Sequence, residues 1–87
     1  MRVDRTEIFT FLRGIFASIF PGQVIDVTAN LSAQDVVGWD SFRQVEIVLA
    51  LEERYAIRIR TRELMNVENV GQLVDLALRK IEVSDPR

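Results

Sequence analysis

Residues 38–59, which read GWDSFRQVEIVLALEERYAIRI, carry the clearest structural signal in the chain. When these residues are placed at 100° intervals around a helix, a compact apolar arc emerges that we assign to the core. The members of this arc are Ile47, Val48, Leu51 and Tyr55. The stretch therefore predicts an amphipathic helix from about Ser41 to Tyr55.

The same helix carries a second apolar stripe. Phe42, Val45 and Leu49 lie on a different arc, mixed with Glu46 and Glu53. A helix in a small domain cannot easily bury both arcs, so this stripe should stay at the surface with a rim of carboxylates. Exposed apolar patches with polar rims usually mark interaction surfaces. The alternative is that neighbouring loops cover Phe42 and Leu49.

The start of this helix carries a serine. Asp40 or Ser41 is expected as its N-cap, and Ser41 with Gln44 reads as a capping box. The orphan N–H groups and the dipole of a helix start also favour a phosphate there. Gly38 lets the chain turn close to the site, and Trp39 is expected as a partly exposed flank. The chain contains no histidine to activate Ser41 as a nucleophile, but another enzyme could modify its hydroxyl.

Two further helices and a short turn are predicted. Helical periodicity from Arg5 to Phe20 gives a broad aromatic face, and Pro21-Gly22 ends that helix. The face comprises Ile8, Phe9, Phe11, Leu12, Ile15, Phe16, Ile19 and Phe20. A last helix is expected over residues 70–81, with Asn69 as N-cap and Gln72 at the third position. A short helix capped by Thr61 is expected over residues 61–65.

The connection over residues 23–40 is unusually long for a compact domain, and such loops are usually functional or pinned to the core. We expect Leu31 and Val36 to anchor it. Residues 24–27 could alternatively be a strand, although no partner strand is evident. These elements together predict an all-α fold, a four-helix bundle with three longer helices and one short one. Residues 1–87 form one domain, with a core over about 5–82 and a frayed tail over 83–87.

Composition narrows the function. The 87 residues include no cysteine and no histidine, which removes the thiolate nucleophile and the commonest general base, so we expect no catalytic activity. A net charge of -2 disfavours a nucleic-acid partner. No apolar run approaches the roughly 18–20 residues that span a bilayer. Residues 1–5 lack the apolar region of a secretory signal, which predicts a cytoplasmic location and no membrane partner.

Several stretches of the sequence resemble a known protein family. Residues 38–42, GWDSF, followed by a leucine-glutamate-glutamate run, Tyr55 and the Ile57/Ile59 pair, are similar to the acyl carrier proteins. In that family an Asp-Ser-Leu signature opens the corresponding helix. The stretch from Asn69 to Val74 resembles the family's last helix, so the resemblance covers most of the chain. Phe42 replaces the usual leucine, and Arg43 stands where an acidic residue is frequent.

The resemblance implies a carrier that performs no chemistry itself. A phosphopantetheinyl transferase would attach 4′-phosphopantetheine from coenzyme A to Ser41, next to Asp40, and the arm's thiol would hold an acyl group as a thioester. The family docks its partners on the helix that bears Phe42, Val45, Glu46, Leu49 and Glu53. Implied partners are a ketosynthase, an acyltransferase or an adenylating ligase of a fatty-acid, polyketide or related specialised pathway. A monomer is expected.

Two alternatives remain open. An aminoacyl or peptidyl carrier would use the same arm, and a helical interaction domain without a prosthetic group would use Ser41 only as a cap. Four arginines lie at the end of the docking helix and just after it, and they suggest a specialised carrier whose partner recognises a different charge pattern. They are Arg54, Arg58, Arg60 and Arg62. Alternatively, they form an ordinary solvated face balanced by Glu52, Glu53 and Glu63.

Overall fold

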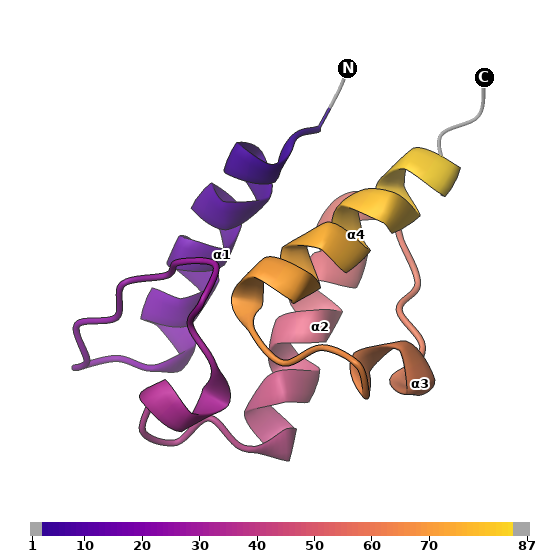
Figure 1. The fold of residues 1–87 in the computed structure, drawn as a ribbon. Helices are drawn as coiled ribbons and strands as arrows, with labels where there is room; N and C mark the ends of the chain where they lie inside the picture. The colour runs from indigo at the N-terminus through magenta and orange to yellow at the C-terminus, as the bar shows by residue number, and fades with distance from the viewer. Residues whose placement is uncertain (1–2, 85–87) are drawn as a thin grey trace.

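The computed structural model describes residues 3–84 and consists of four α-helices and one short 3₁₀ turn (Figure 1). The helices are α1 (Arg5–Ile19), α2 (Ser41–Tyr55), α3 (Thr61–Leu64) and α4 (Val70–Ser84), and the turn η1 spans Ala33–Asp35. No strand occurs within residues 3–84, so the predicted all-α fold is confirmed and the alternative strand over residues 24–27 is wrong.

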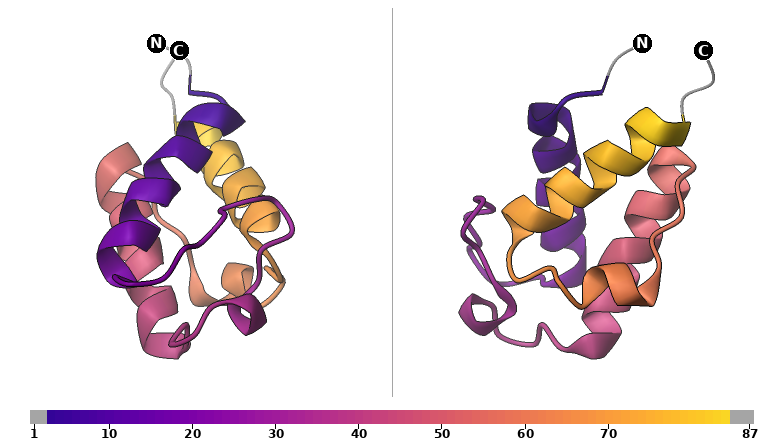
Figure 2. Two further views of the ribbon diagram at one scale, coloured as in Figure 1. Left: turned by 90° about the vertical axis from the view of Figure 1, so that its left-hand side faces the viewer. Right: turned by 45° about the vertical axis from the view of Figure 1, so that its right-hand side comes forward.

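The three long helices form the body of the molecule, and α1 contacts both α2 and α4. The chain runs down α1, crosses the long connection, and returns along α2, so the two helices are antiparallel (Figure 1). The start of α2 lies at the end of the molecule opposite to the first turn of α1 and the last turn of α4 (Figure 2). Ser41, the first residue of α2, is therefore presented at this end of the bundle.

The helix ends follow local capping chemistry. The Asp4 carboxylate accepts a hydrogen bond from the Glu7 N–H at 2.9 Å and so caps α1. At the start of α4, Asn69 Oδ1 accepts from the Gln72 N–H at 2.9 Å, as predicted. The predicted cap Thr61 is wrong: Arg60 holds the N-cap position of α3, and the Glu63 carboxylate accepts from its N–H at 2.9 Å.

The predicted C-terminal boundary was too early. Helix α4 continues to Ser84, three residues past the expected end at Ile81, so Val83 and Ser84 belong to the helix instead of a frayed tail. The remainder of the expected tail, residues 85–87, lies outside the described residues. No residue between Ile81 and Pro86 breaks a helix. Proline disfavours a helix only at its own position and just before it, so α4 can continue past Ile81.

A single apolar cluster joins the three long helices. The buried side chains of α1 are Ile8, Leu12 and Phe16, and α2 contributes Ile47, Val48 and Leu51. Helix α4 buries Val70, Leu73, Val74, Leu76 and Ala77 against them. The predicted core arc of α2 is confirmed for its three aliphatic members. Tyr55, the fourth member, is only half-buried, and its hydroxyl donates to Glu7 Oε2 at 3.4 Å.

The long connection is pinned to the start of α4. The carbonyl oxygen of Leu31 accepts from the Val70 N–H at 2.8 Å, and that of Ala29 accepts from the Gly71 N–H at 2.9 Å. These bonds satisfy helix-start donors that would otherwise be unpaired. A Cβ on Gly71 would lie 2.9 Å from the Ala29 Cβ, so only glycine allows this approach. Val36 is buried as predicted, while Leu31 is half-buried and anchors through its carbonyl group.

The end of α2 offers a test of backbone strain. Ala56 adopts φ 55° and ψ 45°, a left-handed conformation in which a Cβ is unfavourable. We expect Ala56→Gly to raise the free energy of unfolding by about 1 kcal/mol, measured by urea denaturation. Ala17→Gly is the matched control, because Ala17 is exposed inside α1; it should lower stability by about 1 kcal/mol. A loss of stability in Ala56→Gly would contradict this account.

Candidate functional site

Ser41 is the first residue of α2, and its side chain is exposed. The helix is capped by Asp40, whose carboxylate accepts from the Arg43 N–H at 3.0 Å while its carbonyl accepts from the Gln44 N–H at 2.9 Å. The predicted capping box between Ser41 and Gln44 is therefore wrong. Because Asp40 performs the capping, the Ser41 hydroxyl is not needed to hold the helix.

The surroundings of Ser41 suit a phosphate. Within residues 3–84 no oxygen accepts from the backbone N–H of Ser41 or Phe42, which leaves two donors at the positive end of the helix dipole. Gly38, with φ 89°, makes the turn that brings the chain to Asp40 and Ser41. A phosphodiester on the Ser41 oxygen would meet these donors without displacing a hydrogen bond of the hydroxyl.

Trp39 is half-buried beside the serine, and neighbouring aromatic rings hold its side chain in place. Its ring meets Phe16 edge-on, with centroids 5.1 Å apart, and lies 6.4 Å from the ring of Phe20. Its indole N–H donates to Gln44 Oε1 at 2.8 Å. The predicted partly exposed flank is thus confirmed, and the aromatic face of α1 explains why this ring is held in place.

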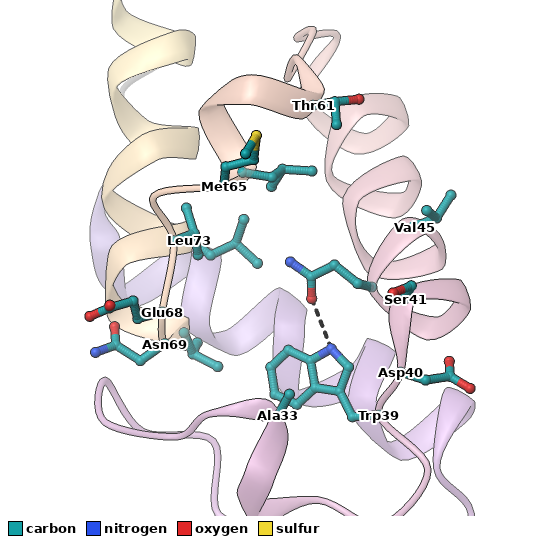
Figure 3. A pocket seen from close by; sticks show the side chains of 14 residues that line it. Ala33, Trp39, Asp40, Ser41, Val45, Thr61, Met65, Glu68, Asn69 and Leu73 are labelled. Atoms are coloured by element: carbon teal, nitrogen blue, oxygen red, sulfur yellow. Dashed lines mark hydrogen bonds between the residues drawn. The ribbon is translucent and has the colours of Figure 1, made fainter.

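A groove of about 560 Å³ opens directly beside Ser41, between α2, α3 and the start of α4 (Figure 3). Most of its wall is apolar. The apolar lining comprises Ala33, Trp39, Val45, Leu64, Met65, Val67, Val70 and Leu73, and the polar lining comprises Asp40, Ser41, Gln44, Thr61, Glu68 and Asn69. Local periodicity does not reveal this groove, because its walls come from segments whose contact depends on helix packing.

The second stripe of α2 is exposed, as the helical wheel predicted. The exposed fractions are 66% for Phe42, 52% for Val45 and 56% for Leu49, so neighbouring loops do not cover them. The acidic rim is weaker than expected. Glu46 pairs with Arg43 at 2.6 Å, and the Arg43 guanidinium also lies 5.5 Å from the centre of the Phe42 ring. Glu53 is exposed and, among the described residues, lies in no ion pair.

The arginines after α2 are not balanced as the solvated-face alternative supposed. Glu52 accepts from the Ile59 N–H at 2.7 Å, and Glu63 pairs with Lys80 at 2.6 Å. The hydrogen bond from Lys80, followed by that from the Arg60 backbone N–H, lowers the pKa of Glu63 below its usual value. These carboxylates hold the backbone and α4. The side chains of Arg58, Arg60 and Arg62 stay exposed and form no ion pair within the described chain.

Neither a metal site nor a membrane span is found in the described part of the chain. No group of three potential metal-ligating side chains occurs within it, and no helix is both long and apolar enough to cross a bilayer. A serine presented to solvent, in a chain without histidine, can be loaded by another protein but has little means of attacking a substrate unaided. The fold and the site are therefore those of a small helical domain that presents an exposed serine at the start of a helix.

Comparison with known proteins narrows this class. The family described as "Phosphopantetheine attachment site" matches residues 10–77. An acyl carrier protein of Acidothermus cellulolyticus is 35% identical over 75 residues, covering 86% of this chain and 89% of that protein. One from Saccharopolyspora erythraea is 30% identical over 76 residues, covering 87% and 80%. The solution structure of the holo acyl carrier protein from Geobacter metallireducens superposes with a TM-score of 0.77 at 33% identity, covering 86% of each chain.

The chain belongs to the acyl carrier proteins, the family with a phosphopantetheine attachment site. It is a carrier of acyl intermediates and not itself a catalyst. Its cofactor is a covalently attached 4′-phosphopantetheine, whose thiol supplies the thioester chemistry when the arm is present. Its role as an acyl carrier implies interaction with biosynthetic enzymes.

Proposed function

We propose that Ser41 carries the arm. A phosphopantetheinyl transferase would direct the Ser41 Oγ onto the phosphorus that bears the pantetheine in coenzyme A. The new P–O bond forms as the bond to the nucleotide phosphate breaks, adenosine 3′,5′-bisphosphate leaves, and the hydroxyl proton passes to a base of the transferase. The exposed Ser41 hydroxyl, free of hydrogen bonds within the described chain, is the observation that supports this proposal most directly.

Intact-mass measurement tests the attachment. The chain is incubated with coenzyme A and a broad-specificity transferase, and we expect complete gain of one phosphopantetheine mass. Trypsin should release residues 14–43, which contain Ser18, Ser32 and Ser41, and fragmentation of this peptide should place the added mass on Ser41. No gain would contradict the proposal and favour a helical interaction domain without a prosthetic group. A gain on Ser18 or Ser32 would contradict the assignment of Ser41 and place the arm elsewhere.

We propose that the arm holds acyl groups of a fatty-acid, polyketide or related specialised pathway. Several relatives carry names of acyl carriers, among them a meromycolate extension acyl carrier protein of Mycobacterium leprae that is 27% identical over 86 residues. These names favour acyl over aminoacyl or peptidyl cargo. A ketosynthase, an acyltransferase or an adenylating ligase would be the partners, and the carrier would act as a cytoplasmic monomer.

We propose that partners dock on the exposed stripe of α2: Phe42, Val45, Glu46, Leu49 and Glu53. Three apolar side chains lie on one exposed face of a helix whose first residue is the modified serine, so a docked partner would sit within reach of the arm. Arg43 neutralises part of this face by pairing with Glu46. A partner that binds this mixed-charge face would need a different charge pattern on its own surface from a partner that binds a purely acidic helix.

Charge reversal and truncation on α2 test this docking. We expect Leu49→Ala and Glu46→Lys each to lower kcat/KM for phosphopantetheine transfer about fivefold, the equivalent of about 1 kcal/mol of lost interface energy. Helical circular dichroism should not change, since Leu49 is 56% exposed. Val24→Ala is the control, because Val24 is fully exposed and belongs to the long connection instead of α2. Equal rates for all four proteins would remove the docking face.

A further inference from the structure

One polar group in the groove is held in a fixed orientation. Trp39 is locked by its ring contacts with Phe16 and Phe20, and its indole nitrogen can only donate a hydrogen bond. Its acceptor is Gln44 Oε1 at 2.8 Å, shown as the dashed line in Figure 3. The indole thus determines which end of the Gln44 amide faces it, and the Nε2 group must point the other way.

The Gln44 Nε2 group has no acceptor within the described chain. The Nε2 group is also accessible, because no buried nitrogen or oxygen of a described side chain lacks a hydrogen-bond partner. Gln44 lines the groove with Ser41, one helical turn away on α2, and the neighbouring wall is apolar at Val45, Leu64 and Leu73. The groove therefore presents one oriented amide donor in mostly apolar surroundings, where a hydrogen bond is worth more than in water.

We propose that Gln44 is a specificity-determining residue that donates a hydrogen bond to an oxygen on the acyl group, close to the thioester. The groove would then favour acyl chains with an oxo or hydroxyl group near the thioester over plain hydrocarbon chains. Leu64, Val67 and Leu73 would take the hydrocarbon remainder. This inference rests on the proposed attachment at Ser41, which brings the cargo to this groove.

Gln44→Glu is the sharpest variant. The carboxylate keeps an oxygen acceptor for the Trp39 indole in a side chain of the same shape, but it removes the amide donor. Gln34→Glu is the matched control, because Gln34 lies exposed in η1, outside the groove lining, and receives the same added charge. Gln44→Met removes both polar atoms and carries the test if the glutamate variant loses its circular dichroism signal.

The test uses three loaded forms of each protein: the free arm, the hexanoyl arm and the 3-oxohexanoyl arm, installed from coenzyme A and its two thioesters. The half-life of each thioester in hydroxylamine is divided by that of the same thioester on free pantetheine. We expect this protection of the 3-oxohexanoyl group to fall about fivefold in Gln44→Glu and Gln44→Met, but not in Gln34→Glu. Protection of the hexanoyl group should change less than twofold in the Gln44 variants.

A second readout follows the side chains directly. In ¹H–¹⁵N spectra the Gln44 amide and the indole of Trp39, the only tryptophan in the chain, should shift in the 3-oxohexanoyl form and stay in place in the other two. A Gln44 shift already present with the free arm would mean that the amide binds the arm itself, and would overturn the inference. Unchanged protection on a fully loaded Gln44→Glu would overturn it as well. Failure of the wild type to gain any arm would instead defeat the proposed attachment, and this inference with it.

Discussion

Replacing Ser41 with alanine should abolish all gain of phosphopantetheine mass. The Ser41 Oγ is the atom to which we assign the phosphodiester, and alanine offers no oxygen at that position. The substitution should leave the fold intact, because Asp40 caps α2 and no hydrogen bond within the described chain depends on the Ser41 hydroxyl. We therefore expect a complete loss of modification with unchanged circular dichroism and an unchanged urea midpoint.

Ser18→Ala is the matched control for this experiment. Ser18 is also an exposed helical serine, but it lies in α1 and outside the groove lining. It should be loaded at the wild-type rate. Equal mass gain in Ser41→Ala would show that the arm is attached elsewhere, and the assignment of Ser41 would have to be withdrawn even though the family membership stands.

Leu51→Ala should cause the largest loss of stability among the substitutions considered. Leu51 is fully buried in the cluster where α2 meets its neighbours, so truncation removes apolar contacts and leaves a cavity. We expect the free energy of unfolding to fall by about 2–5 kcal/mol, measured by urea denaturation. For a domain at the low end of the usual range of about 5–15 kcal/mol, such a loss would bring the free energy of unfolding close to zero.

Leu49→Ala provides the comparison on the same helix. Leu49 lies two residues earlier and is 56% exposed, so the same truncation should change stability by no more than about 0.5 kcal/mol. The two leucines thus separate the core side of α2 from its docking side. Similar losses for both would mean that the helix is rotated relative to the arrangement described above.

The three long helices could be predicted from the sequence to within a few residues. Their apolar residues repeat at a helical spacing, and Pro21, Asn69 and Asp40 mark boundaries through local backbone chemistry. The separation of Leu51 from Leu49 also followed from angle alone. The boundary errors at Thr61 and after Ile81 arose where several neighbouring residues were each compatible with a helix end.

The candidate site also combines features that local sequence reveals with features that it does not. Ser41 and the stripe from Phe42 to Glu53 could be found because they lie within one helix. The hydrogen bond between Trp39 and Gln44 could not be predicted, although the two residues are close in sequence. A capping box with Ser41 was an equally good local interaction for Gln44. The indole is the partner of Gln44 because Phe16 in α1 and Phe20, the residue that caps the end of α1, hold the Trp39 ring in place.

Local sequence is enough to place the helices, the serine and the exposed face of α2, because each depends on residues within a few turns of one another. Tertiary packing sets the groove, the close approach of Ala29 to Gly71 and the orientation of the Gln44 amide. These features join segments far apart in the chain. Their geometry depends on how helices cross and where a long connection is tied down, which local periodicity does not encode.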